Sequence, residues 1–169
     1  MSNELKEVGP SDVTFLFKLK ESKYSAIFKV AMHGKPCVMK VYRDRGPPRW
    51  IRKYREIDMF VRESTAYQRL QAKGFCLQGV TPDFYRTITK IQPSIWPDLH
   101  MFLDDKLPPN AILIEYIPNL QHIDLSNYSK HRLDEIHRIL YDIHKARVYH
   151  GDARPRNMMA SPGESMGNA

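Results

Sequence analysis

Hydrophobic and polar residues alternate along the first part of the chain with a period of two, which is typical of β-strands. Two segments rich in aromatic and β-branched residues, 15–20 and 24–30, predict a pair of strands. A turn signal at 33–35 follows, and the run CVMKVY at 37–42 predicts a third strand. We therefore expect the chain to open with a three-stranded antiparallel meander.

Two later segments carry apolar residues at spacings of three and four, the period of an α-helix. The first covers residues 56–73 and ends before Gly74, a residue typical of helix C-termini. The second covers residues 131–145. The apolar positions are Ile57, Phe60, Val61, Tyr67 and Leu70 in the first helix, and Leu133, Ile136, Leu140 and Ile143 in the second.

Two further strands are predicted between the helices, at 80–90 and 111–117, and a proline-rich loop at 92–110 joins them. Strands and helices that are segregated in this way favour the α+β class over a parallel α/β sheet. The residues at 161–169 are small and polar, and we expect them to be disordered.

The composition fits one globular domain, because 169 residues with 42% hydrophobic and 27% charged content can build a core. The net charge of +7 favours anionic partners without choosing among them. Cys37 and Cys76 form no CxxC pair, which argues against a disulfide framework. Because no signal peptide or membrane-spanning run is apparent, we expect a soluble, cytoplasmic protein without a membrane partner, and the nucleus stays open.

The sharpest chemical signal is the sequence HGDARPRN at 150–157, which has the pattern H-x-D-x-x-x-x-N. It follows the second predicted helix and precedes the apolar pair 158–159. In phosphoryl transfer, the Asp of such a loop accepts the proton of the attacking hydroxyl, and the Asn reaches a metal bound to the phosphates. The alternative interpretation is a polar surface turn that holds these residues by chance.

Two charged residues lie in apolar surroundings. Lys40 interrupts a mostly apolar strand, although Met39 and Val41 point to the opposite face, so Lys40 could simply face water. Glu63 lies three residues after Phe60 and therefore on or beside the apolar face of its helix. It could equally be an ordinary solvated glutamate.

Together, a strand lysine, an inward helix glutamate and the H-x-D-x-x-x-x-N loop resemble the protein-kinase-like superfamily. The resemblance implies a protein-kinase-like fold, with an antiparallel sheet lobe that has one helix and with a partial helical second lobe. It implies that Lys40 contacts phosphate and pairs with Glu63. It also implies that Asp152 is the catalytic base and Asn157 a metal ligand. ATP and Mg²⁺ are the cofactors that follow from it.

The strand end at 114–117 resembles the hinge of that superfamily, so the backbone carbonyl of Glu115 and the backbone N–H of Ile117 are expected to face adenine. Gly151 and the run 155–159 look closer to fungal kinase-like proteins and small-molecule phosphotransferases. The domain boundaries that follow are a tail at 1–12, a sheet lobe at 13–118, a partial second lobe at 119–160 and a tail at 161–169.

The chain also departs from the family pattern. The turn at 20–23 has no glycine, and no aspartate follows Asp152, so an Asp-Phe-Gly-like metal-binding segment is missing. We therefore expect a truncated domain with doubtful Mg²⁺ binding and weak or no catalysis. The apolar face of the helix at 131–145 has little to cover it, which suggests a protein partner.

Two other function classes stay open beside a nucleotide-binding enzyme relative. One is a non-catalytic scaffold or a regulatory, pseudokinase-like fragment. The other, which we favour less, is a nucleic-acid-binding module that uses the basic and aromatic residues at 43–55. The phosphate acceptor does not follow from the sequence, because fold does not fix substrate.

Overall fold

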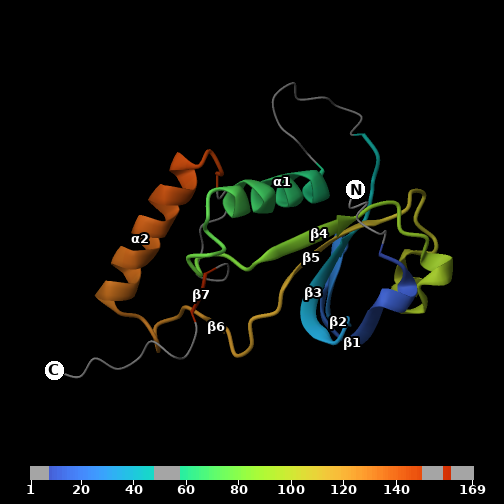
Figure 1. Ribbon diagram of the computed structural model, residues 1–169, viewed down its shortest axis with the longest axis horizontal. Helices are drawn as coiled ribbons and strands as arrows, with labels where there is room; N and C mark the ends of the chain where they lie inside the picture. The colour runs from blue at the N-terminus through green and yellow to red at the C-terminus, as the bar shows by residue number, and fades with distance from the viewer. Residues whose placement is uncertain (1–7, 48–57, 150–157, 161–169) are drawn as a thin grey trace, which may run out of the picture. The chain divides into compact units, whose positions relative to one another are not determined.

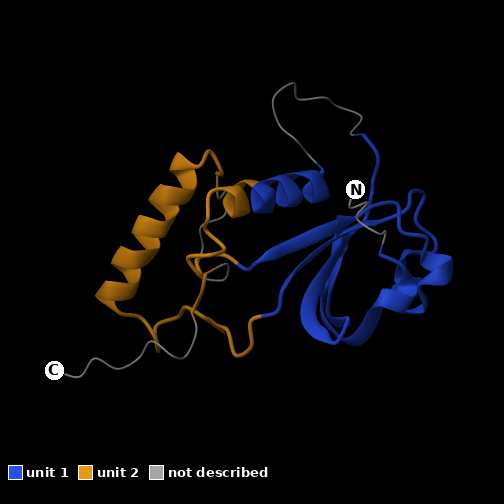
Figure 2. Ribbon diagram, in the orientation of Figure 1, with its two compact units in different colours: residues 1–68, 82–116 blue, residues 69–81, 117–169 orange. Residues whose placement is uncertain are grey.

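The computed structural model describes residues 8–47, 58–149 and 158–160 of the chain (Figure 1). The chain divides into two compact units (Figure 2). Unit 1 comprises residues 1–68 and 82–116, and unit 2 comprises residues 69–81 and 117–169. The predicted lobe boundaries stay a prediction.

The sheet of unit 1 has five antiparallel strands in the order β1-β2-β3-β5-β4 (Figure 1). The strands are β1 (Val13–Glu21), β2 (Ser25–Met32), β3 (Lys35–Tyr42), β4 (Phe84–Ile88) and β5 (Asn110–Glu115). The first three pair in sequence order, which confirms the predicted meander. This sheet together with a few helices confirms the α+β class.

A two-residue turn joins β2 to β3, because Met32 pairs with Lys35 across it. Both turn residues have a positive φ, 50° at His33 and 79° at Gly34. Such turns match the twist of the two strands that they connect. The turn that the sequence predicts at 33–35 is therefore present in the structure, at His33 and Gly34.

The side chains of β3 and β5 alternate between two different cores, one on each face of the sheet. On β3, Cys37, Met39 and Val41 are fully buried in the first core, whereas Val38 and Tyr42 belong to the second. The first core consists of Val13, Ala26, Phe28, Val30, Cys37, Met39, Val41, Ile91, Trp96, Leu99, Phe102, Ala111 and Leu113. The second core consists of Tyr42, Phe84, Ile112 and Ile114, with Val38, Phe60 and Tyr67 packed against it.

The segment between β4 and β5 is not the plain loop that its prolines predict. It contains two 3₁₀-helices, η2 (Pro93–Ile95) and η3 (Pro97–Phe102), each of which begins at a proline. The buried side chains of Trp96, Leu99 and Phe102 are spaced by three, the period of a 3₁₀-helix, and so they face the first core together. The segment therefore covers one face of the sheet.

Helix α1 (Met59–Ala72) places Phe60 and Tyr67 against the second core. The Asp58 carboxylate caps its start by accepting the backbone N–H groups of Phe60, at 2.8 Å, and Val61, at 3.1 Å. The predicted start at residue 56 lies outside the described residues. The first part of α1, in unit 1, thus covers the face of the sheet opposite the 3₁₀ segment.

Strands β4 and β5 are shorter than the patterns predict. Residues 80–83 precede β4 instead of belonging to it, because Gly79 has a φ of 69°, Pro82 has no N–H to donate, and Val80 packs in unit 2. Strand β5 ends at Glu115, so Tyr116 and Ile117 lie beyond the sheet.

Unit 2 has a small core made of Leu70, Phe75 and Ile143. Helix α2 (Lys130–Lys145) confirms the predicted second helix, and the Ser129 hydroxyl caps it by accepting the N–H of Arg132 at 3.2 Å. The two short strands β6 (Gln121–His122) and β7 (Met159–Ala160) pair with each other. Of the α2 side chains only Ile143 is buried. The expected protein partner stays a prediction.

Candidate functional site

Lys40 lies in the middle of β3, on the face of the sheet that α1 covers. Its neighbours across the ladder are Ile27 on β2 and Ile112 on β5, and the side chain of Ile112 is fully buried. The Lys40 side chain is only 20% exposed. Lys40 therefore does not occupy a water-facing position, although the alternation along its own strand allowed one.

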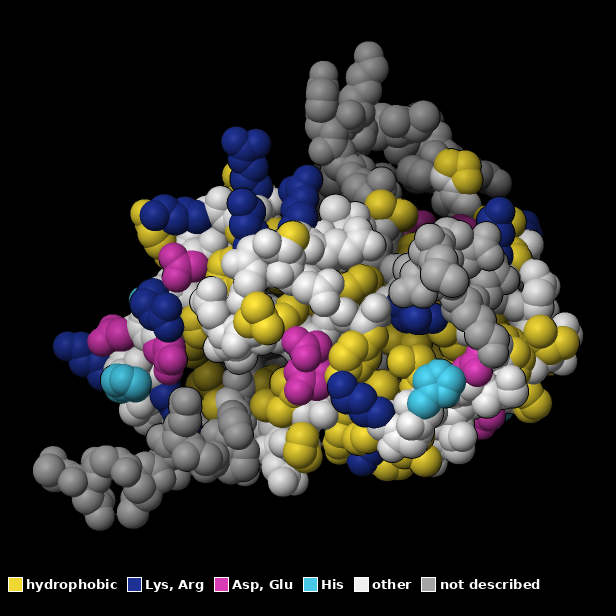
Figure 3. All heavy atoms as spheres, viewed as in Figure 1, with side chains coloured by type: hydrophobic (Ala, Val, Ile, Leu, Met, Phe, Trp, Pro, Cys, Tyr) yellow, Lys and Arg dark blue, Asp and Glu magenta, His cyan; other side chains and the backbone are white. Residues whose placement is uncertain are grey.

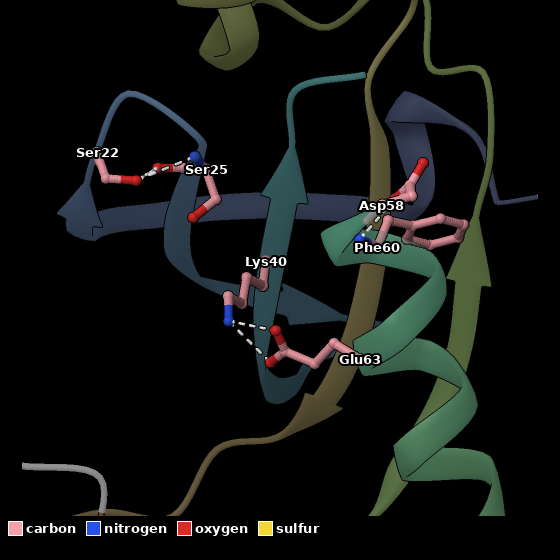
Figure 4. Close-up of polar contacts among 6 residues, drawn as sticks. All are labelled: Ser22, Ser25, Lys40, Asp58, Phe60 and Glu63. Atoms are coloured by element: carbon pink, nitrogen blue, oxygen red, sulfur yellow. Dashed lines mark hydrogen bonds and ion pairs between the residues drawn. The ribbon is translucent and has the colours of Figure 1, made fainter. Parts of the chain in front are cut away.

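Glu63 reaches Lys40 from the second turn of α1 (Figure 4). The Lys40 Nζ atom lies 2.8 Å from Oε1 and 2.6 Å from Oε2 of Glu63. The Glu63 side chain is 29% exposed. The resemblance implied this contact across 23 positions of sequence, and the structure contains it. The roles of the two residues in phosphate chemistry stay a prediction.

Tyr42 adds an aromatic wall to this ion pair. The Lys40 ammonium lies 5.2 Å from the centroid of the Tyr42 ring, and the ring packs edge-on against Phe60. The Tyr42 hydroxyl is buried, and no hydrogen-bond partner for it exists among the described residues. Burial raises the pKa of Tyr42 above its ordinary value, and the nearby Glu63 carboxylate raises this pKa further.

Of the predicted adenine-facing residues, Glu115 is the last residue of β5 and Ile117 lies beyond it. The N–H of Glu115 donates to the carbonyl of Asp83 at 2.8 Å, and the Glu115 carboxylate accepts the N–H of Asp83 at 3.1 Å. These reciprocal bonds fix the end of the strand in unit 1. Lys29 lies 3.9 Å from the centroid of the Tyr116 ring. Ile117 is the first residue of the second segment of unit 2.

The turn between β1 and β2, which lacks glycine, is closed by the side chain of Ser22 (Figure 4). The Ser22 hydroxyl accepts the N–H groups of Tyr24, at 3.2 Å, and Ser25, at 3.1 Å. It also donates to the carbonyl of Ser25 at 3.2 Å. The amides of the turn are thus engaged by the protein itself, whereas a glycine-rich loop directs such amides at phosphates.

Arg43, the first basic residue of the 43–55 segment, already has protein partners. It forms a salt bridge with Asp105, donates to the carbonyl of Met101 at 3.0 Å and stacks on Phe102 at 4.7 Å. Arg43 therefore fastens the end of η3, and Asp105 after it, to the end of β3. Most of the predicted nucleic-acid-binding segment lies outside the described residues.

The predicted base Asp152 and the predicted metal ligand Asn157 also lie outside the described residues. Within residues 8–47, 58–149 and 158–160, no three His, Cys, Asp or Glu side chains gather into a group that could hold a metal ion. A short strand is predicted at 158–159, after the H-x-D-x-x-x-x-N sequence, and the structure has it one residue later as β7 (Met159–Ala160).

Sequence reasoning missed three features of this site. Tyr42 was read only as the end of a strand, although a period of two places it on the face of Lys40. Ser22 offered the signal of a serine at the start of a turn, which commonly bonds its own backbone two or three residues on. The pairing of Arg43 with Asp105 had no local signal, since 62 positions separate the two.

No protein-family model matches the chain, and a search of curated proteins found no match either. None of the helices in the described part of the chain is both long and apolar enough to cross a membrane. The geometry of unit 1 is therefore the basis on which function is proposed.

Proposed function

We propose that the chain contains the nucleotide-binding lobe of a protein-kinase-like phosphotransferase, with ATP as its ligand. The observation that carries this proposal is the ion pair of Lys40 and Glu63 between the middle of β3 and helix α1. The Lys40 ammonium comes from β3, is partly buried and is held in place by Glu63 of α1. Such a fixed lysine loses less conformational freedom on binding an anionic ligand than a mobile surface lysine does.

The donor count of the ammonium supports phosphate as the ligand group. A lysine ammonium has three N–H donors, and the two Glu63 oxygens occupy two of them. The third can donate to a phosphate oxygen while Glu63 holds the ammonium in position. Charge neutralisation by a positioned cation is what phosphoryl transfer requires of the protein.

The other predicted residues complete the proposal. The carbonyl of Glu115 and the N–H of Ile117 would bind adenine, and Lys40 would bind the phosphates. Asp152 would accept the proton of the acceptor hydroxyl, and Asn157 would help to hold Mg²⁺, which neutralises charge on the phosphates. These roles rest on the resemblance and on the position of Lys40 beside Glu63.

A second candidate function, a non-catalytic nucleotide-binding or regulatory domain, is favoured by the β1–β2 turn. Because Ser22 engages the amides of Tyr24 and Ser25, those amides would have to exchange partners before they could bind a phosphate. We therefore expect ATP binding without efficient transfer.

Thermal unfolding in the presence of ATP tests nucleotide binding. A ligand at ten times its dissociation constant stabilises the folded state by about 1.4 kcal/mol, which raises the Tm of a chain of this size by about 3–5 °C. We expect millimolar ATP to give a shift of this size in the wild type. In Lys40→Met the shift should be lost, because the phosphate-binding cation is gone.

Each variant is compared with itself in the absence of ATP, since Lys40→Met leaves the Glu63 carboxylate unpaired and lowers stability by about 1–3 kcal/mol. Lys35→Met, at an exposed position of the same strand, is the matched control and should retain the shift. A full ATP shift in Lys40→Met would contradict the proposal. Hydrolysis of ATP with Mg²⁺ at the rate of an active kinase would exclude the non-catalytic candidate.

A further inference from the structure

Strand β1 is an edge of the unit 1 sheet. It pairs with β2 on one side, and in the described part of the chain no strand pairs with its other side. The outward N–H and C=O groups of such a strand are a template for another extended segment. The register with β2 shifts twice, between Phe15 and Phe17 and between Lys18 and Lys20, and β-bulges of this kind occur preferentially at sheet edges.

A groove of about 320 Å³ runs beside this edge, between β1 and the 3₁₀-helix η3. Polar and apolar groups contribute about equally to its wall, and polar side chains come from both elements. The lining residues are Phe15, Leu16, Phe17, Lys18, Phe28, Pro97, Asp98, His100 and Met101. All of them belong to unit 1.

Large apolar side chains of β1 are unusually exposed for a strand of a folded domain. Leu16 is 48% exposed, Phe17 is 51% exposed and Leu19 is 45% exposed. On the face of unit 1 that Figure 3 presents, hydrophobic side chains reach the surface among lysine and arginine side chains. Clustered apolar side chains on a strand edge are typical of an interaction surface.

The charge at the end of β1, and in the turn after it where Lys23 lies, is positive. Lys18 pairs with Glu21, whereas Lys20 and Lys23 form no salt bridge with any described residue. The pKa of Glu21 is lowered, first by its hydrogen bond and ion pair with Lys18, and more weakly by Arg43 and His100. Positive groups therefore surround the one carboxylate of this strand.

This charge discriminates between possible occupants of the edge. A second copy of β1 that pairs in parallel and in register would place Lys18 and Lys20 opposite the same lysines, and like charges across a strand pair are destabilising. Lysines on an edge strand commonly prevent such self-pairing. A strand with acidic side chains would instead gain from Lys20 and Lys23, and its apolar side chains could enter the groove.

We propose that β1 binds an extended segment of a partner protein, with alternating apolar and acidic side chains, which adds to the unit 1 sheet as a sixth strand. Main-chain hydrogen bonds to the free edge supply affinity in this mode, and the groove and the lysines supply specificity. The groove and the exposed apolar side chains of this surface do not include Lys40 or Glu63, whereas Lys20 is in register with Lys40 two strands away, through Ile27. The peptide is therefore tested without nucleotide.

The test uses the full chain and a fluorescein-labelled ten-residue peptide that alternates valine and glutamate. Fluorescence anisotropy should show saturable binding that weakens as salt is added. Hydrogen exchange should show new protection in β1. The double variant Lys20→Glu/Lys23→Glu should bind the peptide about tenfold more weakly, which corresponds to about 1.4 kcal/mol.

Two controls isolate charge and backbone pairing. Lys90→Glu/Lys106→Glu changes the net charge equally at exposed positions of unit 1 and should bind as the wild type does. A peptide N-methylated at alternate residues cannot donate to the edge and should not bind. The proposal is overturned if the wild type does not bind the peptide, or if the N-methylated peptide binds equally well. It is also overturned if a ten-residue peptide that alternates valine and lysine binds equally well, or if sedimentation shows a homodimer that Lys20→Glu/Lys23→Glu changes.

Discussion

The surroundings of Lys40 include residues from outside β3, and the sequence of β3 alone does not indicate them. Alternation on β3 places Lys40 opposite Met39 and Val41, and both faces of the sheet are covered. What makes the position tolerable for a cation is Glu63, at 2.6–2.8 Å, together with the Tyr42 ring. A charge that is removed from water needs such partners.

Tyr42 leads to a prediction about alkaline stability. Because its pKa is raised in the folded state, the folded state keeps the phenol proton above pH 10 whereas the unfolded state loses it, so stability falls as pH rises. This loss amounts to about 1.4 kcal/mol by pH 11. Tyr42→Phe should lack this loss, as measured by urea unfolding at pH 9 and pH 11.

At pH 7 we expect Tyr42→Phe to be as stable as the wild type or more stable by up to about 1 kcal/mol, since it removes a buried hydroxyl without a partner among the described residues. Tyr128→Phe, which changes an exposed tyrosine, controls for the loss of one phenol. Equal pH dependence of Tyr42→Phe and the wild type would show that the hydroxyl is not held in its protonated form.

At the scale of elements, the two helices end in the same way with different residues. After α1, Gly74 has a φ of 81°, and the N–H of Phe75 bonds the carbonyl of Leu70 at 3.0 Å. After α2, Arg147 has a φ of 59°, and the N–H of Val148 bonds the carbonyl of Ile143 at 3.2 Å. Glycine adopts this left-handed conformation without the steric penalty that arginine incurs.

We therefore expect Arg147→Gly to stabilise the protein by about 0.5–1 kcal/mol and Gly74→Ala to destabilise it by about 1 kcal/mol. A Cβ at Gly74 would meet no atom closer than 3.8 Å, so its cost is conformational. Urea unfolding measures both changes. Arg147→Ala is the control, because alanine lacks the guanidinium but still has the steric penalty of the left-handed conformation. If Arg147→Ala raises the free energy of unfolding as much as Arg147→Gly does, the effect comes from the removed charge instead.

The elements with strong periodicity could be predicted from the sequence, and those whose boundaries depend on distant packing could not. The meander, α2 and the Gly74 end of α1 agree with their patterns. The segment 92–110 misled because its prolines indicate a loop, while Trp96, Leu99 and Phe102 face the core only with a 3₁₀ period. That period becomes informative only when a sheet is present to receive the three side chains.

At the scale of the whole molecule, the two units differ in how much apolar surface they bury. Unit 1 contains two cores, one on each face of its sheet, whereas the described part of unit 2 has one core of three buried residues. Local stability follows buried apolar contacts, so unit 2 should open at a lower free energy than unit 1. Each unit contains one cysteine, which makes this difference measurable.

Cys37 is fully buried in unit 1, and burial raises the pKa of its thiol. Cys76, in unit 2, is partly exposed, with its Sγ atom 3.5 Å from the Thr81 hydroxyl. We expect thiol reagents to modify Cys76 in the native protein at least about a hundredfold faster than Cys37, and at lower urea concentrations. Mass spectrometry of labelled peptides measures both rates, and Cys76→Ser is the control. An equal dependence of the two rates on urea would contradict the inferred order of opening.

The sequence by itself determined the α+β class, the meander and the two long helices, because these depend on periodicities among residues close along the chain. It also indicated Lys40 and Glu63 as candidates. Only the tertiary structure decided that they meet, that Tyr42 completes their surroundings and that Ser22 engages the β1–β2 turn. It also decided that no described strand pairs with the outer side of β1. Burial, ion pairing and edge exposure depend on segments far apart in the chain, and local patterns do not contain that information.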